Sequence, residues 1–539
     1  MTRKAIVKRV LVLLFAFLAF IMITPQIITP FFKRKLEGLF KEKLKGYNVE
    51  FSQLEISIIK NNIALNKVRF NPVSYDEKHK AMQGEIETIF FHGIDWFKAL
   101  FKKEMFIRDI RILHPILLFP FPIDTNPVVP VLAGFNLHIN TLAVDDFQLQ
   151  LRDSLSKNLL MIEDGRIKID EFEISKEDTL SVGLIKKMQF TIKSIQKTSR
   201  DSLYTYTIKG MNYSNALKQL TIDTMRLVPN YTESAFANKH VYEVDRFHSN
   251  ATNIRLSDFA FEKYMLTNNL VCSYLELGQL DLKIFRDNRK PDSHKKKHLL
   301  QDLIRSYPGI LHIDSLKVLD GDIIYKEHAE NAVEAGSLSF NKLSSTIYKI
   351  SNDTINLNSS SSMDLYFDAL LMGKGRIHLY LKTKIWDPAY TIAFGGHVSG
   401  FDMMALNPIL GKNAFIYITS GKIESVNFSF EADKVRARGQ MLLKYHDLQV
   451  AVKNKQNDDT VGLKSKLMTF IANKKILDSN PLPGENVRIG VIDYERDPEK
   501  FVLNYCFKAA FSGIKSTMLK TLPKKQNIFK KIFQERKEN

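Results

Sequence analysis

The sequence predicts a mainly β protein, an elongated and curled antiparallel β-sheet with short interposed helices, one N-terminal transmembrane helix and a C-terminal amphipathic helix. Three observations predict this fold class. Apolar and polar residues alternate from about Val49 onward, a period that is typical of strands with one apolar face. An uncharged stretch runs from Val10 to Phe32. Two pairs of similar segments recur in the same order, which indicates a repeated unit.

The uncharged stretch VLVLLFAFLAFIMITPQIITPFF has 23 residues. At about 1.5 Å per residue, a helix of this length can cross a hydrocarbon core of roughly 30 Å. Arg3, Lys4, Lys8 and Arg9 precede the stretch, as in a signal sequence, and no A-x-A cleavage site follows it. We therefore expect an uncleaved signal anchor over residues 1–35, with a cleaved signal peptide as the alternative. The anchor positions are Val10, Leu14, Phe17, Ile21 and Ile28.

Basic residues flank the apolar stretch on both sides, so the positive-inside count does not choose its orientation. The commoner arrangement keeps the short N-terminal tail inside and exports the rest of the chain, and we expect that arrangement. The segment FFKRKLEGLFKEKL follows and sets its apolar residues near one helical face, which predicts an interfacial helix lying on the membrane. These residues are Leu36, Leu39, Phe40 and Leu44.

The body of the chain is predicted to be strand after strand. RIHLYLKTKIW places Ile377, Leu379 and Leu381 on one face of a strand, with other residues between them on the opposite face. TLAVDDFQLQLRD, RIKIDEFEIS and SLYTYTIKG alternate in the same way, and clusters of Asn, Asp, Gly and Ser separate such segments as turns. Helical patterning is confined to residues 95–103, residues 298–307 and the C-terminal end.

The repeat is visible in two alignments without gaps. LHINTLAVDDFQLQLRD, from Leu137, matches LHIDSLKVLDGDIIYKE, from Leu311, at an offset of 174 residues. The apolar positions of the segment from Ile89 match those of the segment from Ile254, at an offset of 165 residues. The two matches predict two copies of a unit, each reading strand, short helix, strand and then a run of long strands. Chance similarity between amphipathic strands is the alternative.

One face of each copy is predicted to be apolar. Such a face can line an open groove or pack the core of a closed sandwich or barrel, and alternation alone does not distinguish the two. The candidate inward positions are Leu142, Val144, Leu149 and Leu151 in the first copy, and Leu316, Val318, Ile323 and Tyr325 in the second.

The segment EKFVLNYCFKAAFSGIKSTML predicts a C-terminal amphipathic helix, which Pro523 ends. Lys508 lies within it, so the helix is not expected to cross a membrane. The helix and the basic tail suit an anionic lipid surface or a partner, and a helix that caps the open end of the sheet is the alternative. The apolar arc includes Phe501, Phe507, Phe511, Ile514 and Met518.

The positive charge is concentrated at the two ends of the chain. The net charge is +18, of which residues 1–45 contribute +8 and residues 499–539 contribute +7. The long middle is therefore close to neutral. This distribution favours membrane-proximal basic ends over a body that binds nucleic acid.

Motifs of catalysis and metal binding are absent from the sequence. No HExxH, Walker A loop, G-x-S-x-G elbow or paired-cysteine metal site occurs. Cys272 and Cys506 are the only cysteines, which excludes a disulfide framework. Gly373-Lys374-Gly375 predicts a β-turn rather than a phosphate loop, and Asp145-Asp146 predicts a strand bend or turn. We expect no enzyme activity, no catalytic residue, no metal and no cofactor.

The order of these features resembles the AsmA-like family of Gram-negative envelope proteins, the repeating β-groove proteins of the AsmA, TamB and YhdP type. A loop of that family reads strand, Gly-x-Asp, short helix, strand and proline, and Gly93, Asp95 and Pro115 match it. Residues 395–518 are similar to the C-terminal end of members from Bacteroidota. The matching residues there are Gly400, Asp402, Leu406, Asn407, Pro408, Ser420, Gly421, Gly439, Tyr445, Asp447, Leu448, Asn480, Pro481, Arg496 and Asp497.

The resemblance implies a single-pass protein of the bacterial inner membrane with the bulk of the chain in the periplasm. It implies that the protein binds and conducts phospholipid along an apolar β-groove and supports outer-membrane lipid homeostasis, without a nucleic-acid partner. An anionic lipid surface or an outer-membrane partner is expected at the C-terminal end. The alternative is an envelope scaffolding or assembly protein with a filled β core that does not transport lipid.

The expected domains follow from the anchor, the repeat and the resemblance. They are residues 1–35, the anchor; 36–230, the first β-groove module; 231–390, the second module; 391–498, the C-terminal AsmA-like β region; and 499–539, the amphipathic helix and basic tail.

Overall fold

The computed structural model describes residues 29–30, 32–34, 36–38, 40–41, 47–57, 60–73, 82–95, 98, 104–120, 136–152, 158–174, 187–354, 362–452 and 463–520. These residues are mainly β, as the sequence predicts, and hold 21 strands with short helices between some of them. The chain divides into two compact units. Unit 1 comprises residues 1–225 and 260–266, and unit 2 comprises residues 226–259 and 267–539.

Unit 1 contains ten complete strands and the first part of an eleventh. They are β1 (Tyr47–Glu50), β2 (Gln53–Ser57), β3 (Asn62–Pro72), β4 (Gln83–Ile94), β5 (Glu104–Leu113), β6 (Ile116–Pro120), β7 (Asn136–Arg152), β8 (Asn158–Ile174), β9 (Lys187–Thr198), β10 (Tyr204–Ser214) and β11 (Gln219–Pro229). Helical residues occur among residues 29–41, and most of α4 (Phe261–Thr267) also belongs to this unit.

The pairing order in unit 1 follows the chain closely. β1 and β2 both pair with β3, β3 pairs with β4, and β5 and β6 both lie between β4 and β7. β7, β8, β9 and β10 then follow as antiparallel neighbours. The pairings of β5 and β6 with β7 are parallel, whereas the other pairings named here are antiparallel.

Unit 2 contains the remaining strands and most of the helices. The strands are β12 (Asp245–Ser257), β13 (Leu270–Asp287), β14 (Leu311–His328), β15 (Gly336–Ser351), β16 (Met363–Leu371), β17 (Gly375–Thr383), β18 (Ile392–Asp402), β19 (Ile416–Ala432), β20 (Arg436–Val452) and β21 (Ile489–Glu495). The helices are α3 (Glu233–Asn238), α5 (Leu300–Arg305), η2 (Met403–Leu406), α6 (Asn407–Asn413), α7 (Leu463–Lys475) and α8 (Val502–Met518).

The strands of unit 2 pair in chain order from β12 to β21. Each of these pairings is antiparallel except β13–β14, which is parallel. The sheets of both units are therefore mixed: most pairings are antiparallel, as predicted, and the parallel pairings were not predicted. Parallel neighbours need a crossover connection, because the chain must return to the end of the sheet at which the first strand began. Residues 288–310, which carry α5, make that connection in unit 2.

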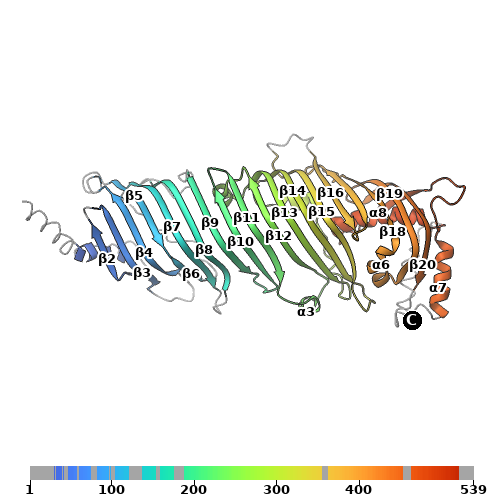
Figure 1. Cartoon of the computed structure of the whole chain (residues 1–539), viewed down its shortest axis with the longest axis horizontal. Coiled ribbons are helices and arrows are strands. Elements are labelled where there is room, and N and C mark those ends of the chain that lie inside the picture. The colour runs from blue at the N-terminus through green and yellow to red at the C-terminus, as the bar shows by residue number, and fades with distance from the viewer. Residues whose placement is uncertain are drawn as a thin grey trace, which may run out of the picture. The chain divides into compact units, whose positions relative to one another are not determined.

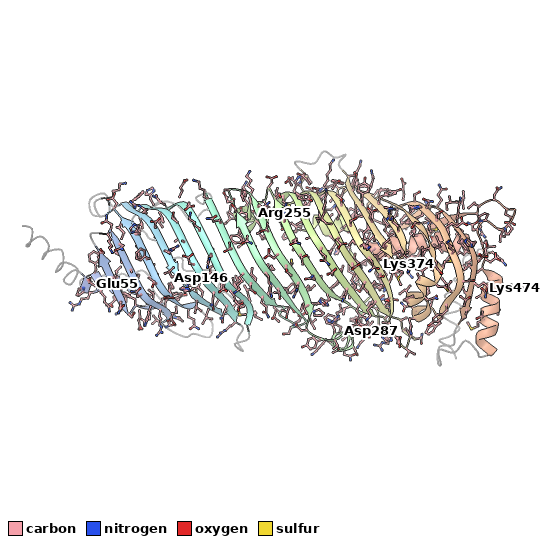
Figure 2. All side chains as sticks on the ribbon, in the orientation of Figure 1. Glu55, Asp146, Arg255, Asp287, Lys374 and Lys474 are labelled. Atoms are coloured by element: carbon pink, nitrogen blue, oxygen red, sulfur yellow. The ribbon has the colours of Figure 1, made fainter. Side chains whose placement is uncertain are left out.

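Two local irregularities fall where the sequence predicts a bend and a turn. Asp146 interrupts β7 with a backbone φ of 54°, and the register against β8 shifts between Val144 and Phe147. Figure 2 labels Asp146 on the sheet of unit 1. The extra residue makes a β-bulge, which bends the strand and increases its twist, so the bend predicted at Asp145-Asp146 is confirmed. The turn predicted at Gly373 is also confirmed, because Gly373 has a φ of 65° between β16 and β17.

The helices of unit 2 pack on its last strands. α8 packs on β20 and β21, α7 packs on β20, and α6 packs on β15 and β19 (Figure 1). α5 lies within the helix predicted over residues 298–307. In the part of the chain that the structure describes, no helix combines the length and the apolar character needed to cross a membrane. The predicted anchor residues Val10, Leu14, Phe17, Ile21 and Ile28 lie outside the described residues.

Several polar residues of the C-terminal region hold its connections together. The Asp402 carboxylate accepts a hydrogen bond from the Met404 N–H at 2.8 Å and caps η2. The Asn407 side chain donates to the Ile418 carbonyl at 2.9 Å and accepts from the Ile418 N–H at 2.8 Å. The buried Asn480 side chain bonds the Leu443 carbonyl and both backbone groups of Arg488. These side chains satisfy backbone groups that the ends of strands leave unpaired.

Candidate functional site

Chains of directly paired residues trace rows of side chains across each sheet, because paired residues of neighbouring strands share a face. In unit 1 two such rows are apolar from end to end. Row A1 consists of Ile56, Ile63, Phe91, Ile110, Leu142, Ile169 and Met188. Row B1 consists of Leu54, Leu65, Ile89, Ile112, Val144, Ile167, Phe190 and Tyr213. Rows A1 and B1 lie on the same face, since their members are two residues apart on each strand.

Unit 2 carries a matching pair of rows on its own sheet. Row A2 consists of Leu256, Leu275, Leu316, Ile347, Leu365, Leu381, Phe394 and Phe430. Row B2 consists of Ile254, Leu277, Val318, Ser345, Phe367, Leu379, Gly396, Phe428 and Met441. Ser345 is the one polar side chain in these two rows. Rows A2 and B2 therefore form an apolar face that is continuous across β12 to β19.

The pairing registers of the two units repeat at the offsets of the sequence alignments. Ile110 pairs with Leu142 across the parallel pair of unit 1, and Leu275 pairs with Leu316 across the parallel pair of unit 2. These are the same positions after offsets of 165 and 174 residues. A bulge residue also recurs, since Asp164 in β8 and Lys342 in β15 both have positive φ values, 49° and 51°. The predicted repeat of strand order is confirmed, which makes chance similarity an inadequate explanation.

The eight candidate inward residues all lie in apolar rows of this kind. Leu142 belongs to row A1, Val144 to row B1, Leu316 to row A2 and Val318 to row B2. The other four lie beyond the bulges, in shorter rows that continue the apolar pattern. Leu149 pairs with Leu117 and Ile162, Leu151 with Phe119 and Leu160, Ile323 with Leu282 and Phe340, and Tyr325 with Ile284 and Leu338.

Tyr325 differs from the other seven candidates because it ends in a polar group. Its hydroxyl donates a hydrogen bond to the Glu327 carboxylate at 2.6 Å. Burial, followed by the nearby charge of Glu327, raises the pKa of Tyr325, so the hydroxyl stays protonated. Its ring is apolar and its hydroxyl is satisfied, so Tyr325 extends the row up to a polar boundary.

The members of rows A1, B1, A2 and B2 are buried or half-buried, and none is exposed. Row B1 of unit 1 is most deeply buried near its two ends. Leu65 is 4% exposed at the β3 end, and Tyr213 is 3% exposed at the β10 end, while Leu142 and Val144 between them are half-buried. In unit 2, Leu275, Leu316, Ile347 and Leu365 are half-buried and Leu381 is 4% exposed. The half-buried residues retain apolar surface that another molecule could cover.

Aromatic side chains cover both ends of the apolar face of unit 1. At the β2–β3 end, Phe32, Leu36 and Phe40 pack against the buried cluster that contains Leu54 and Leu65. At the β9–β10 end, the Phe261 ring of α4 lies 4.7 Å from the Phe190 ring and 5.5 Å from the Tyr213 ring, measured between centroids. The Glu262 carboxylate fixes α4 there, because it accepts hydrogen bonds from the Tyr213 hydroxyl at 2.7 Å and from the Asn215 amide at 2.8 Å.

The crossover of unit 2 covers part of its apolar face. Leu299 and Ile304 of this connection are buried in the same core cluster as Leu381 of row A2. The Gln301 amide donates to the Thr383 hydroxyl at 2.7 Å, and both side chains are buried. Thr383 lies two residues after Leu381 on β17 and so shares its face. α5 therefore packs directly on the apolar face at β17.

α8 covers the same face at β20 and β21 and approaches it very closely. Gly490 and Gly513 face each other there, since a Cβ added to Gly490 would stand 2.5 Å from the Gly513 carbonyl oxygen. A Cβ added to Gly513 would stand 2.8 Å from Ile492 and 3.0 Å from Met441 of row B2. The helix presents Tyr505, Cys506 and Ala509 as its buried face. Row B2 thus ends beneath α8, where no room remains for another molecule.

Charged groups fix the start of α8 to the rest of unit 2. The Lys500 ammonium donates to the Glu243 carboxylate at 2.8 Å and to the Asp292 carboxylate. Hydrogen bonds from Lys500 lower the pKa of Asp292. Burial would lower the pKa of Lys500, but its hydrogen bonds to Asp292 and Glu243 outweigh burial and raise it. We refer to Lys500, Glu243 and Asp292 as the α8 latch.

A second ion pair supports the α8 latch. The Arg286 guanidinium binds the Asp245 carboxylate through two hydrogen bonds of 2.7 and 2.6 Å. Its third nitrogen lies 3.7 Å from Glu243 of the latch. The side chains of Arg286, Asp245 and Glu243 are 17%, 14% and 13% exposed, so these charges are substantially withdrawn from water and depend on one another.

The hollows of the two units lie mainly on the opposite, more polar faces. In unit 1 a hollow of about 1090 Å³ is lined by side chains such as His92, Arg111 and Lys168, which alternate with rows A1 and B1 along the strands. In unit 2 a hollow of about 640 Å³ is lined by side chains such as Tyr366, His378 and Asn427. Each unit therefore has an apolar face with cross-strand rows and a polar face with a hollow.

The C-terminal residues predicted to form an apolar arc do not all turn to one environment. Phe501 is 42% exposed and Phe507 is 57% exposed, whereas Phe511, Ile514 and Met518 are half-buried. Ile514 and Met518 pack against the core of unit 2. The Phe507 and Phe511 rings stack at 6.2 Å between centroids. One side of the predicted arc thus packs inward, and the other carries exposed apolar side chains.

His, Cys, Asp and Glu supply the usual metal ligands of proteins, and all four occur among the residues that the structure describes. These residues include no group of three or more His, Cys, Asp or Glu side chains that could hold a metal ion. Both cysteines are buried, at 1% exposed for Cys272 and 3% for Cys506. Burial raises the pKa of the Cys272 thiol to about 11 and that of the Cys506 thiol to about 12, so both stay protonated and unreactive at neutral pH.

Comparison of the sequence with protein-family models gives no match, and comparison with curated proteins gives none either. What the fold and the site define is a class of architecture: two mixed-sheet units, each with one apolar face built in the same register.

Proposed function

We propose that the protein is anchored in the bacterial inner membrane, extends into the periplasm, and carries phospholipid acyl chains along apolar grooves formed by curling of its sheets. In this proposal the protein supports outer-membrane lipid homeostasis. The observation that carries it is the pair of apolar rows in each unit, which include half-buried residues such as Leu142, Val144, Leu316 and Ile347. The resemblance to the AsmA-like family supports the same proposal and supplies the membrane and the compartment.

The energetics of lipid movement favour such a surface. Each CH₂ group exposed to water costs about 0.8 kcal/mol, so a chain of 16 carbons costs roughly 12 kcal/mol when it is exposed. An apolar row removes that cost wherever the chain touches it. Apolar contact is also non-directional, so a lipid that slides from one strand to the next loses and gains equivalent contacts.

The repeat fits this proposal, because lipid passage needs the same surface at successive positions. Leu142 and Leu316 are equivalent residues of the two copies, and each is flanked by apolar partners on both neighbouring strands. A second copy of the unit supplies more surface of one kind rather than a new chemical group.

A specific observation favours a second candidate, an envelope scaffolding or assembly protein with a filled β core. α5 and α8 already occupy the apolar face at β17 and at β20–β21. If further protein segments cover the half-buried rows in the same way, the face is a core and carries no lipid. The two candidates differ in what touches the central residues of rows A1 and A2.

The C-terminal end is proposed to face an anionic lipid surface or an outer-membrane partner. Leu503 and Phe507 of α8 are 74% and 57% exposed, and Lys508 follows them. Exposed apolar side chains beside a lysine suit contact with a lipid interface, where apolar groups enter and the ammonium meets headgroups.

Photo-crosslinking in living cells tests the lipid proposal on the full chain. The photoreactive residue p-benzoylphenylalanine replaces Leu316 of row A2 in one protein and Lys317, its neighbour on the opposite face, in the matched control. A second pair replaces Leu142 and Ala143 in unit 1. After irradiation and purification, intact-mass spectrometry reads the mass of each adduct.

We expect phospholipid adducts at Leu316 and Leu142 and few or none at Lys317 and Ala143. Crosslinks within the chain at Leu316 and Leu142, without any lipid adduct, would contradict the lipid proposal and support the filled core. Equal lipid adducts on both faces would show that the apolar rows are not the binding surface.

A further inference from the structure

Unit 2 has a hollow that lies mainly on its polar face. Its lining also includes four residues of row B2, namely Phe367, Leu379, Gly396 and Phe428. Its volume is about 640 Å³, and it lies over β16 to β21. Two cross-strand rows form its floor. The first consists of Tyr366, Tyr380, Gly395, Ser429 and Gln440, and the second of Asp368, His378, His397, Asn427, Leu442 and Ile489. The hollow therefore combines aromatic rings, imidazoles, amides and a hydroxyl on a rigid sheet.

The electrostatic character of the hollow is close to neutral. Asp368 is the one acidic side chain among the described residues that line it, and these include no Lys or Arg. The Asp368 carboxylate is held by the His378 imidazole on the next strand. Because no lysine or arginine lines it, the hollow is poorly suited to a phosphate or another anion, although the whole chain carries a net charge of +18. A cationic ligand would find a single carboxylate that already has a partner.

The hydrogen-bonding groups of the hollow have unused capacity. The Asn427 side-chain oxygen bonds the His397 ring nitrogen Nδ1 at 2.9 Å, which leaves the Asn427 amide nitrogen and His397 Nε2 without a partner among the described residues. The Tyr366 and Tyr380 hydroxyls and the Gln440 amide likewise make no hydrogen bond within that part of the chain. These groups both donate and accept, and they are the kinds of group that fix the orientation of a polar, uncharged ligand.

The aromatic rings supply flat apolar surface beside these polar groups. Tyr366 and Tyr380 are directly opposite each other on β16 and β17, and Tyr366 is 41% exposed. Tyr380 lies over Gly395, where an added Cβ would stand 2.5 Å from the Tyr380 hydroxyl oxygen, so the glycine makes room for the ring. The His378 and His397 rings stack on the next pair of strands at 6.4 Å between centroids. Neighbouring strands are about 4.8 Å apart, so successive groups are spaced by roughly one sugar ring.

We propose that this hollow binds a neutral glycan. A sugar presents hydroxyl groups around its rim and C–H groups on its faces, which matches amides and imidazoles next to tyrosine rings. The hollow is open, so a bound glycan keeps part of its hydration and can continue as a chain across β16 to β20. The inference rests on the polar-face residues of the hollow, none of which is used in the argument for the lipid proposal.

Saturation-transfer NMR on the full chain in lipid nanodiscs tests the glycan site. Detergents with sugar headgroups are avoided because they would compete for the site. The probes are chitotetraose and maltotetraose at millimolar concentration, with inorganic phosphate as a competitor. The variants are Tyr380→Ala and Asn427→Ala, and the matched control is Tyr206→Ala, which removes a tyrosine of unit 1 that is 38% exposed.

We expect saturable transfer to at least one of the two oligosaccharides, unchanged by phosphate. Each hollow variant should weaken binding about tenfold, whereas Tyr206→Ala should bind like the unaltered chain. Circular dichroism and the thermal midpoint check that the variants fold. The proposal is overturned if neither oligosaccharide binds, if phosphate displaces it, or if folded hollow variants bind as well as the Tyr206→Ala control.

Discussion

Ile347 and Thr346 are adjacent on β15 but face opposite sides of the sheet, so they offer a matched test of the lipid surface. Ile347 is half-buried in row A2 between Leu316 and Leu365, whereas Thr346 pairs with Lys317 and Tyr366 on the other face. The substitutions Ile347→Asp and Thr346→Asp each add one carboxylate. They change the charge of the chain equally and place the new carboxylate on opposite faces of the sheet.

The expected magnitude follows from the position of Ile347. Loss of a half-buried isoleucine removes about 1 kcal/mol of apolar burial, so the variant should still fold. An acyl chain lying on row A2 would have to displace water from the new carboxylate, which costs several kcal/mol. A cost of about 3 kcal/mol lowers occupancy by roughly 100-fold.

Phospholipid per chain, measured by mass spectrometry after purification of the full-length proteins under identical conditions, provides the readout. Lipid held by any membrane-embedded segment is common to the unaltered chain and both variants, so the difference in lipid content between the variants reports binding at row A2. We expect Ile347→Asp to lose lipid and Thr346→Asp to keep it. Equal lipid content in the two folded variants would refute the reasoning.

Three further predictions concern the packing of α8 and the last strands of unit 2. The Tyr505 hydroxyl is buried without a hydrogen-bond partner among the described residues, whereas the Tyr445 hydroxyl donates to the Leu477 carbonyl at 3.0 Å. In chemical denaturation, Tyr505→Phe should therefore leave the free energy of unfolding unchanged or raise it by up to about 1 kcal/mol, and Tyr445→Phe should lower it by about 1–2 kcal/mol. Equal losses in the two variants would contradict this assignment. Gly490→Leu should push α8 off β21, because its side chain would meet the Gly513 backbone. Limited proteolysis should then cut within residues 496–520 faster than in the control Gly484→Leu, which strains a positive φ but places the new side chain in open space. Equal cutting in the two variants would mean that the close contact does not hold the helix. Lys500→Met should destabilise unit 2 by about 1–3 kcal/mol at pH 7, because it removes the cation of Asp292 and leaves Glu243 only its 3.7 Å contact with Arg286. Because the pKa of Asp292 is lowered, its share of this stability is present above the ordinary carboxyl pKa and is lost as the pH falls through the lowered value. The difference in unfolding free energy between Lys500→Met and the unaltered chain should therefore shrink in acid. A difference that grows in acid would contradict the α8 latch.

The alternation of apolar residues predicts the apolar faces well, because it is a local property of a strand. Ile377 and Leu381 of RIHLYLKTKIW are buried on β17, and His378 between them is exposed. The gapless alignments also predict the repeated pairing, since Leu142 and Leu316 occupy equivalent places in rows A1 and A2. Sequence spacing even allows for the bulges, because the candidates Val144 and Leu149 are an odd number of residues apart.

Strand order and helix packing are less accessible from the sequence, because they depend on distant partners. Alternation is the same in parallel and antiparallel strands, so it does not predict the parallel pairing of β13 with β14. The large apolar side chains predict the apolar arc of α8, but the buried face of the helix also includes the small residues Ala509 and Gly513. Close packing on Gly490 requires small residues there, and Gly490 is 23 positions away in the sequence. The Lys500–Glu243 contact spans 257 positions and leaves no local signal.

The measurement that tests the central claim most directly is cryo-electron microscopy of the full chain purified from bacterial membranes. The lipid account predicts elongated density against Leu275, Leu316, Ile347 and Leu365 of row A2, and against the matching residues of row A1, that no segment of the chain explains. Protein side chains packed against both rows, with no unexplained density, would contradict the account and establish a filled core.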